Sequence, residues 1–528
     1  MKCILSGRVV TMDAARTVLP NGDVYLDGNT IRQVSGPSQP PPAGFESAKQ
    51  IDTQGIIFPG LIELHNHLSY NILELWSVPK VFGDRGQWQR HAQYVQLVNG
   101  PMLILSKSTD PRVLAAIARF AETKCLLGGV TTSQGISLKS DRLQKYYHGA
   151  MRVVEDPSEP GFLKAATHIP DLHARDWDGF NKEIQKARCL LLHLSEGFDD
   201  TALDAFRALR NEQTGAWAIS GALAGIHCAA LGDAEFAVMR AHQGSMIWSP
   251  LSNLMLYGRT AQVGIARQHG VPIALGSDWS PSGSKNLMHE LKVAKVANEI
   301  MGYGFSDADI VSLATSSPAE IVKWDKWVGS IAPNKRADLT VIAAPAASDP
   351  YAAIIAARET DVQLVMIDGS AAVATPALMA ALGATGESIS VGGQPRLINY
   401  GTPDPDIVPI SYAQAVEVLS AALANLPDVS QAPAGHALGA ERERFWSLAL
   451  DEQEETGFAL RPMLPFKGTN TGPDVERLEP DAIAAAPIGP VPLDKVSVPD
   501  DVDYFEKIEG QLNLPTAIKD GLKRFYSV

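Results

Sequence analysis

Short runs typical of strands alternate with longer helical stretches between residues 57 and 328, and this alternation constrains the fold more than any other feature. Repeated β–α units favour a parallel sheet, and eight of them favour a barrel with its helices outside. An open doubly wound sheet is disfavoured, because no glycine-rich phosphate turn follows the first strand. The eight strand candidates are residues 56–65, 129–136, 151–156, 163–169, 189–197, 223–228, 245–250 and 271–279.

The segments on either side of this region have strand-and-turn character. Asp27-Gly28 stands between two β-rich runs in VYLDGNTIRQV, which predicts a hairpin. We therefore predict an α/β chain in which residues 57–328 form a (β/α)8 TIM-type barrel and residues 1–56 join residues 329–400 in a small β-sandwich. Residues 401–528 are expected to form a C-terminal extension, with proline-rich stretches between the helical pieces ISYAQAVEVLSAALANL and GAERERFWSLALDEQEE.

The composition restricts the partners and the compartment. With 45% hydrophobic and 20% charged residues the chain is typical of a globular protein, and it has no run of about 18 apolar residues that would span a membrane. A net charge of −14 without a block of Lys or Arg disfavours nucleic acid as a partner. The four cysteines lie far apart without a CxxC pair, and the first residues are typical of a strand rather than a secretory signal. A cytoplasmic location is therefore expected.

His65 and His67 flank Asn66 at the end of the first strand candidate, PGLIELHNH. Because side chains alternate along a strand, the two imidazoles are expected to point the same way, into the mouth of a barrel. Two neutral imidazoles there can share one divalent cation. An HxH pair also arises by chance in surface loops, so this motif alone decides nothing.

Three further candidates stand at the ends of other predicted strands: His193 in CLLLHLSEG, His227 in LAGIHC and Asp278 in IALGSDW. Each residue alone could be a polar group at the edge of the core. Barrel active sites, however, are assembled where the strands end, so agreement between four strand ends indicates a metal site. The sequence contains no GxSxG elbow, Walker loop or EF-hand loop that would compete with it.

Several segments resemble successive landmarks of the amidohydrolase superfamily. These are PGLIELHNH, LLLHLSEG, IHC, WSPLSN, ALGSDW and SSPAEIVKWDKWVGSIAPNKRADLTVI, in the family's order over residues 1–370. Within the superfamily they are similar to the branch that holds cytosine deaminase, guanine deaminase and the triazine hydrolases. The segment after residue 400 is not part of the family's pattern. The run LSYNILELW after the HxH motif also differs from the sequence common in the deaminases.

The resemblance implies that His65, His67, His193 and Asp278 bind one divalent metal ion, with Zn²⁺ preferred and Fe²⁺ as the alternative. Such an ion lowers the pKa of water from about 15.7 towards ~7, and Asp278 would accept the proton released. The resemblance further implies that Glu196, three residues after His193, protonates the leaving group or a ring nitrogen. In the same branch the residue matching His227 contacts the attacking water or the developing oxyanion.

Alternatives remain open for these residues. Glu196 could be a solvated loop carboxylate or a helix cap. In binuclear relatives the residue matching His227 binds a second metal, together with a carboxylated lysine at the end of the fourth strand. The nearest lysine here, Lys164, stands at the start of that strand, which favours one metal. His168 and His173, near the end of the same strand, could contact the substrate, but the surface of a loop is the preferred interpretation.

Four residues near the motifs have less specific signals. Ser252 and Asn253 in WSPLSN match a family segment that often lines the pocket, although Ser and Asn also cap helices. Trp279, directly after Asp278, could form a wall for a flat ligand or could pack in the core. Thr131 and Thr132 are expected to be structural, because β-branched residues suit a buried strand.

Three functions follow as alternatives. The leading one is hydrolysis of a carbon–nitrogen bond other than a peptide bond in a small molecule, by a metal-dependent deaminase or amidohydrolase. The second is hydrolytic dehalogenation of a heterocycle, which uses the same attack of water on an electron-poor carbon. The third is a noncatalytic barrel scaffold that binds a partner through its extension. A homo-oligomer is one assembly that the resemblance allows, since relatives are commonly dimers or larger.

Overall fold

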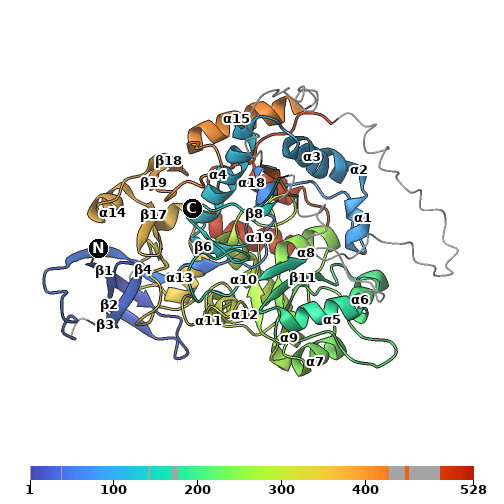
Figure 1. The fold of residues 1–528 in the computed structure, drawn as a ribbon, viewed down its shortest axis with the longest axis horizontal. Coiled ribbons are helices and arrows are strands. Elements are labelled where there is room, and N and C mark those ends of the chain that lie inside the picture. The colour runs from blue at the N-terminus through green and yellow to red at the C-terminus, as the bar shows by residue number, and fades with distance from the viewer. Residues whose placement is uncertain are drawn as a thin grey trace.

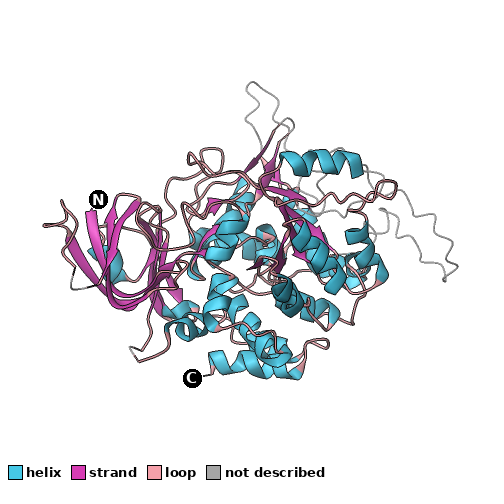
Figure 2. Ribbon diagram, turned by 90° about the horizontal axis from the view of Figure 1, so that it is seen from below, coloured by secondary structure: helices cyan, strands magenta, loops and turns pink. Residues whose placement is uncertain are grey.

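The computed structural model describes residues 2–36, 39–140, 143–168, 177–345, 347–426, 446–450 and 488–527. Figure 1 shows the N-terminal strands on the same side of the molecule as β17, β18 and β19, away from most helices. In Figure 2 these strands form one body, and helices surround the strands of the other body. The two bodies correspond to the strand-rich and the alternating parts of the sequence.

Eight parallel strands lie within the helix-rich body. Five of them form one sheet in the order β10-β11-β12-β13-β14, and three form a second sheet in the order β5-β6-β9. Each predicted strand run contains one of these strands, so the prediction of eight parallel strands is confirmed. Their bounds are β5 Leu61–Ile62, β6 Val130–Ser133, β9 Arg152–Val153, β10 Ala166–His168, β11 Leu190–Leu194, β12 Leu223–His227, β13 Ser245–Trp248 and β14 Ile273–Leu275.

Backbone hydrogen bonds also connect the two sheets, at both of their open edges. Near β9 and β10, the Ala165 amide donates to the Val154 carbonyl over 2.9 Å. Beyond β5 and β14, the Asp278 amide donates to His65 O over 3.0 Å, and the His67 amide donates to Asp278 O over 2.6 Å. The carboxyl ends of β5 and β14, the first and last of the eight strands, therefore lie side by side, and the HxH motif lies next to Asp278.

The first strand candidate, 56–65, is predicted as one strand, and this prediction is wrong. The structure divides it into β4 (Lys49–Pro59), which belongs to the strand-rich body, and β5 (Leu61–Ile62), which belongs to the parallel strands. Gly60 lies at the division, where a Cβ atom would be 2.2 Å from Thr131 Cγ2. Only glycine permits this close approach, so the run changes its hydrogen-bond partners at that point.

One nine-stranded sheet joins the segments before and after the parallel strands, in the order β18-β19-β17-β16-β15-β4-β1-β2-β3. β4 runs antiparallel to β15 and parallel to β1, so it links the two segments. The predicted hairpin at Asp27-Gly28 is confirmed, since β2 and β3 pair there and Gly28 has a φ of +61°. The bounds are β1 Lys2–Val10, β2 Val18–Asp27, β3 Thr30–Ser35, β15 Leu339–Ile342, β16 Val362–Ile367, β17 Ser370–Ala374, β18 Glu387–Val391 and β19 Gln394–Ile398.

The described part of the C-terminal extension contains helices and one short strand. The run ISYAQAVEVLSAALANL forms α15 (Tyr412–Ala424), capped by Ser411. Most of GAERERFWSLALDEQEE lies outside the described residues, but residues 446–450 contain strand β20 (Ser447–Leu448) where a helix is predicted. β20 pairs with β7 (Ser137–Lys139), which pairs with β8 (Gln144–Tyr146). β7, the partner of β20, lies about 310 residues earlier in the sequence, and such long-range pairing overrides local helix propensity.

Helix α4 (Pro111–Leu127) follows the predicted helical run PRVLAAIARFAETKCLL. Asp110 caps it by accepting from the Arg112 amide, and Pro111 suits its first turn. The other helices are η1 Leu68–Ile72, α1 Arg85–Gln89, α2 Ala92–Tyr94, η2 Val95–Asn99, α3 Gly100–Ser106, α5 Trp177–Lys186, α6 Asp200–Arg207, α7 Asp233–Ala241, α8 Pro250–Tyr257, α9 Val263–His269, α10 Leu287–Met301, α11 Asp307–Ser312, α12 Ser316–Ile321, α13 Pro350–Ala356, η4 Glu359–Asp361, α14 Pro376–Ala381, α18 Tyr504–Glu509 and α19 Thr516–Tyr526. No helix among the described residues has both the length and the apolar character needed to cross a bilayer.

Candidate metal centre and active site

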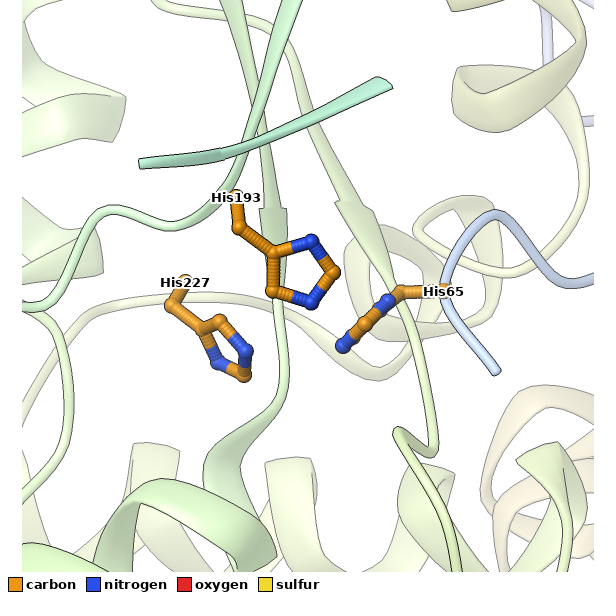
Figure 3. Close-up of side chains that lie close together, drawn as sticks. All are labelled: His65, His193 and His227. Atoms are coloured by element: carbon orange, nitrogen blue, oxygen red, sulfur yellow. The ribbon is translucent and has the colours of Figure 1, made fainter. Parts of the chain in front are cut away.

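The predicted ligand residues converge at one end of the parallel strands. His65 Nε2 lies 3.0 Å from Asp278 Oδ1, and His67 Nε2 lies 3.6 Å from the same oxygen. The ring centroid of His193 lies 4.7 Å from that of His65 and 5.2 Å from that of His67. Possible ligand atoms of His65, His67 and Asp278 all lie within 4.8 Å of one another, and so do those of His65, His193 and His227. Figure 3 shows this second set of three rings.

These side chains come from different strand ends. His193 lies in β11 and His227 is the last residue of β12, while His65 and Asp278 follow β5 and β14. His227 and Asp278 both have a φ of +66°, a left-handed conformation that non-glycine residues rarely adopt. Such strain persists where the surrounding structure holds a side chain in a required direction. Gly276 assists, because a Cβ there would lie 2.4 Å from His65 Cβ.

Burial keeps the imidazoles neutral in the absence of a metal. His65, His193 and His227 are at most 2% exposed. Burial lowers the pKa of His65 and of His227 to about 4, and it lowers the pKa of His193 well below its usual range. Although burial alone would raise the pKa of Asp278, the neighbouring His65 and His227 hold it below its usual range. Neutral imidazole and ionised carboxylate are the forms that bind a divalent cation.

The donor set fits a divalent metal ion. His65 Nδ1 and His193 Nδ1 are buried and have no hydrogen-bond partner in the part of the chain that the structure describes. Buried polar atoms are almost always satisfied, so unpartnered nitrogens in this cluster of imidazoles indicate a ligand that completes them. Three imidazoles with one carboxylate suit Zn²⁺ or Fe²⁺ rather than the oxygen-seeking Mg²⁺ or Ca²⁺.

Glu196 faces the same cluster. Its Oε2 lies 3.7 Å from His227 Nε2 and 3.6 Å from Arg85 Nε, and its Oε1 accepts a hydrogen bond from Tyr257 Oη over 2.9 Å. Burial raises the pKa of Glu196, against the opposing effect of the Arg85 charge. A carboxyl group with a raised pKa is suited to deliver a proton. The alternatives of a solvated loop carboxylate or a helix cap do not hold, because Glu196 is buried and Asp199 caps α6.

Helix α8 supplies two residues to the site. Asn253 Nδ2 lies 3.1 Å from His227 Nδ1, and Tyr257 contacts Glu196 as described above. Residues 253 and 257 are four apart and therefore share one face of the helix. The N-cap of α8 is Ser249, so the capping role considered for Ser252 and Asn253 is wrong. Ser252 Oγ lies 3.5 Å from the hydroxyl of Ser282 within the core.

A buried network of hydrogen bonds holds Asn66, the middle residue of the HxH motif. Asn66 Nδ2 donates to Glu63 Oε2 over 2.9 Å and to Ser277 Oγ over 3.2 Å. The Asn66 amide donates to Gln134 Oε1 over 3.0 Å. The Ser277 amide donates to Glu63 Oε1 over 2.9 Å. Hydrogen bonds from residues around a site orient its ligands, and this network joins the neighbours of His65 to those of Asp278.

Aromatic side chains flank the cluster on one side. The Trp279 ring lies 5.4 Å from that of His67 and 5.7 Å from that of Trp88. Trp88 Nε1 donates to Tyr257 Oη over 2.9 Å, so the aromatic group is also connected to Glu196. Trp279 is 2% exposed and packs beside the site. Its position therefore agrees both with packing in the core and with a wall beside a flat ligand.

The remaining candidates lie elsewhere or carry no chemistry. Lys164 is exposed and pairs with Asp156 at 2.5 Å. Thr131 donates to Leu61 O over 3.4 Å, in agreement with a structural role. His168 is the last residue of β10, and His173 lies outside the described residues.

Sequence reasoning missed Arg85, Trp88 and Tyr257. The spacing of Tyr257 from Asn253 is a signal that could have found it, since both face His227 and Glu196 from α8. Arg85 and Trp88 come from α1, in a segment without a recognised motif. The Arg85 amide donates to Glu196 O over 3.2 Å, a contact between residues more than a hundred positions apart that no local pattern encodes.

Comparisons with known sequences show similarity to amidohydrolases and deaminases. The amidohydrolase family profile matches residues 218–372. The 5-methylthioadenosine/S-adenosylhomocysteine deaminase of Desulfitobacterium hafniense is 23% identical over 414 residues, which cover 70% of this chain and 92% of that protein. The 5'-deoxyadenosine deaminase of Methanothermobacter thermautotrophicus is 23% identical over 397 residues, which cover 66% and 88%.

Solved structures share the fold. An adenosine deaminase of Xanthomonas campestris with bound zinc has a TM-score of 0.55 at 16% identity, over 81% of this chain and 98% of that one. A variant of the atrazine chlorohydrolase of Arthrobacter aurescens, complexed with zinc and atraton, has a TM-score of 0.57 at 17% identity, over 70% and 95%. The α/β fold of this chain is thus of the TIM-barrel type. Residues 218–372 of this chain thus match the amidohydrolase family, and the longer alignments make the chain similar to relatives named as deaminases.

Proposed function

We propose that this metal-dependent hydrolase of carbon–nitrogen bonds is a deaminase of 6-aminopurine nucleosides. Water replaces the exocyclic amine of the ring, so that the C–N bond breaks, a C=O bond forms and ammonia leaves. The convergence of three imidazoles and Asp278 in one buried cluster carries the hydrolytic assignment. The substrate class is supported by the relatives, which are named as deaminases of adenosine derivatives, and by the aromatic group beside His67.

His65, His67, His193 and Asp278 are proposed to hold one divalent ion, with Zn²⁺ preferred over Fe²⁺. When bound, such an ion would act as a Lewis acid that lowers the pKa of water, so that a nucleophile is available at neutral pH. A single ion is favoured because Lys164, the candidate for a bridging carboxylated lysine, is exposed and paired with Asp156. His227 then stays available for a role towards the water.

The protein groups supply proton transfer and orientation. Asp278 is ionised and accepts the proton of the attacking water. Glu196, with its raised pKa, delivers a proton to the ring or to the leaving amine. His227 is neutral, and its contact with Asn253 orients it to stabilise the charge that develops during attack. Tyr257 and Arg85 hold the Glu196 carboxyl group in place.

Several features of the architecture are part of the proposal. The hydrogen bonds from Ala165 to Val154 and from Asp278 to His65 support closure of the eight strands into one (β/α)8 barrel over residues 57–328. Residues 1–56 and 329–400 are then a β-sandwich, and residues 401–528 are the extension. Four free, buried cysteines support a cytoplasmic location, because reduced thiols are typical there. A homo-oligomer is the proposed assembly.

An assay of ammonia release tests the substrate class. The zinc-loaded full chain is incubated with adenosine, 5'-deoxyadenosine, 5-methylthioadenosine, guanine and a chlorinated triazine. We expect turnover of the adenosine derivatives, and much slower turnover by a Glu196→Gln variant prepared in the same way. Activity on guanine alone would contradict the nucleoside class, and chloride release from the triazine alone would favour the dehalogenase instead.

A further inference from the structure

The C-terminal segment, residues 488–527, packs on the loops that carry the candidate metal ligands. The Asp494 amide donates to Ile72 O over 2.9 Å, and Leu493 forms a β-bridge with Leu73. Further along, Gln511 Nε2 donates to Trp76 O over 3.2 Å. Helix α19 of this segment packs against α10, and Figure 2 shows the C-terminus at the outer edge of the helix-rich body. The segment therefore covers part of the body that carries these loops.

A buried ionic cluster fastens this segment to the rest of the protein. Asp494 is 3% exposed, and its two carboxylate oxygens lie 2.5 Å from Lys124 Nζ and 2.6 Å from Lys285 Nζ. Asp501 lies 3.0 Å from Lys285 Nζ and 3.2 Å from Lys507 Nζ. Both aspartates come from the C-terminal segment, but only Asp494 contacts Lys124 among the ion pairs of the described residues.

Lys124 transmits this contact to the loops after β5 and β14. Its Nζ donates to Asn71 O over 2.9 Å and to Ser280 Oγ over 2.5 Å. Asn71 Oδ1 in turn accepts from the Ser280 amide over 2.9 Å, and Asn71 Nδ2 donates to Asn66 Oδ1 over 2.7 Å. Asn66 lies between His65 and His67, while Ser280 lies two residues after Asp278. A continuous chain of polar contacts therefore runs from Asp494 to the neighbours of three candidate ligands.

We propose that Asp494 is a positioning residue for the metal centre, which it reaches through Lys124. The proposal rests on the proposed function, because it takes His65, His67 and Asp278 as ligands. A buried ammonium requires a counter-ion, and Asp494 supplies it from a segment distant in sequence. With that charge in place, Lys124 holds Asn71 and Ser280 in one arrangement, so that the ligand loops are ordered before an ion binds.

Zinc affinity of the full chain tests this role. Wild type, Asp494→Asn, Lys124→Met, the double variant and the control Asp501→Asn are titrated with Zn²⁺ against a chromophoric chelator, after thermal melting has shown that each is folded. We expect Asp494→Asn and Lys124→Met to weaken zinc binding by roughly 10-fold or more, a size typical of residues that orient ligands. The double variant should be no weaker than the worse single variant, because both changes break the same chain of contacts. Asp501→Asn should bind zinc within about twofold of wild type.

Different results separate the two proposals. If Asp494→Asn does not fold, Lys124→Met decides, since it leaves Asp494 paired with Lys285. Unchanged zinc affinity in folded Lys124→Met overturns the positioning role, and so does an equal loss in Asp501→Asn, which would indicate general loosening of the segment. Failure of the proposed function has another signature, in which wild type and His193→Ala bind zinc equally or not at all.

Discussion

The candidate metal centre and the ionic cluster around Asp494 are both buried and polar, but their polar atoms differ in their hydrogen-bond partners. At the metal centre, His65 Nδ1 and His193 Nδ1 have no hydrogen-bond partner in the described part of the chain. In the ionic cluster, Asp494 accepts from two lysines, and Lys124 in turn has three acceptors. Buried nitrogens without a hydrogen-bond partner indicate a ligand-binding site, whereas fully paired charges indicate a structural role.

The largest effect is expected from removal of one imidazole. His193→Ala should abolish both metal retention and activity, because it deletes a ligand from a set of four. Metal content after dialysis and the deaminase assay measure the two effects. His269→Ala, which removes an imidazole paired with Asp233 away from the site, is the control and should retain both. Full metal retention by His193→Ala would show that His193 is not a ligand, and the imidazole cluster would then no longer differ in role from the ionic cluster.

A change at Glu196 should separate chemistry from binding. Glu196→Gln keeps the shape and the contact with Tyr257 but cannot deliver a proton. We expect metal content to be unchanged and kcat to fall by roughly 10²- to 10⁴-fold. Glu183→Gln, on the exposed face of α5, serves as a matched control with normal kcat. Turnover at the wild-type rate would return Glu196 to a structural role.

The metal-free protein should lose stability in acid. The pKa of His65 and of His227 is about 4 when folded, against 6.5 for an exposed imidazole. Between these values the unfolded chain binds more protons, so the free energy of unfolding rises with pH and is lost as pH falls from 6.5 towards 4. Melting temperatures of chelator-treated protein across this range measure the effect. A flat profile would show that the imidazoles are not buried in the neutral form.

The smallest effect is expected at Tyr257. Tyr257→Phe removes the hydrogen bond to Glu196, which is worth roughly 1 kcal/mol, or about five- to tenfold in kcat, and should leave metal content unchanged. Tyr303→Phe, which loses a bond to the Ala261 carbonyl instead, is the control. Equal losses of kcat in the two variants would mean that Tyr257 acts only through stability.

The sequence predicts those parts of the molecule that local patterns encode. Eight apolar runs separated by helical stretches are enough for the parallel strands, and residues at their ends are enough to bring His65, His193, His227 and Asp278 together. The division of the first run at Gly60 was not predictable, because it depends on contact with Thr131, about 70 residues away.

Contacts between distant segments account for the rest. Arg85 meets Glu196 only because α1 folds over the site, and Asp494 meets Lys124 across 370 positions. Neither residue belongs to a motif or a periodic pattern. Their roles follow from burial and charge pairing, which become visible only in three dimensions.

Anomalous diffraction from crystals of the zinc-loaded full chain tests the central claim most directly. We expect one strong zinc peak, about 2.0–2.2 Å from nitrogens of His65, His67 and His193 and from an oxygen of Asp278. A map with no peak among these four side chains, or with zinc bound only elsewhere, would contradict the account.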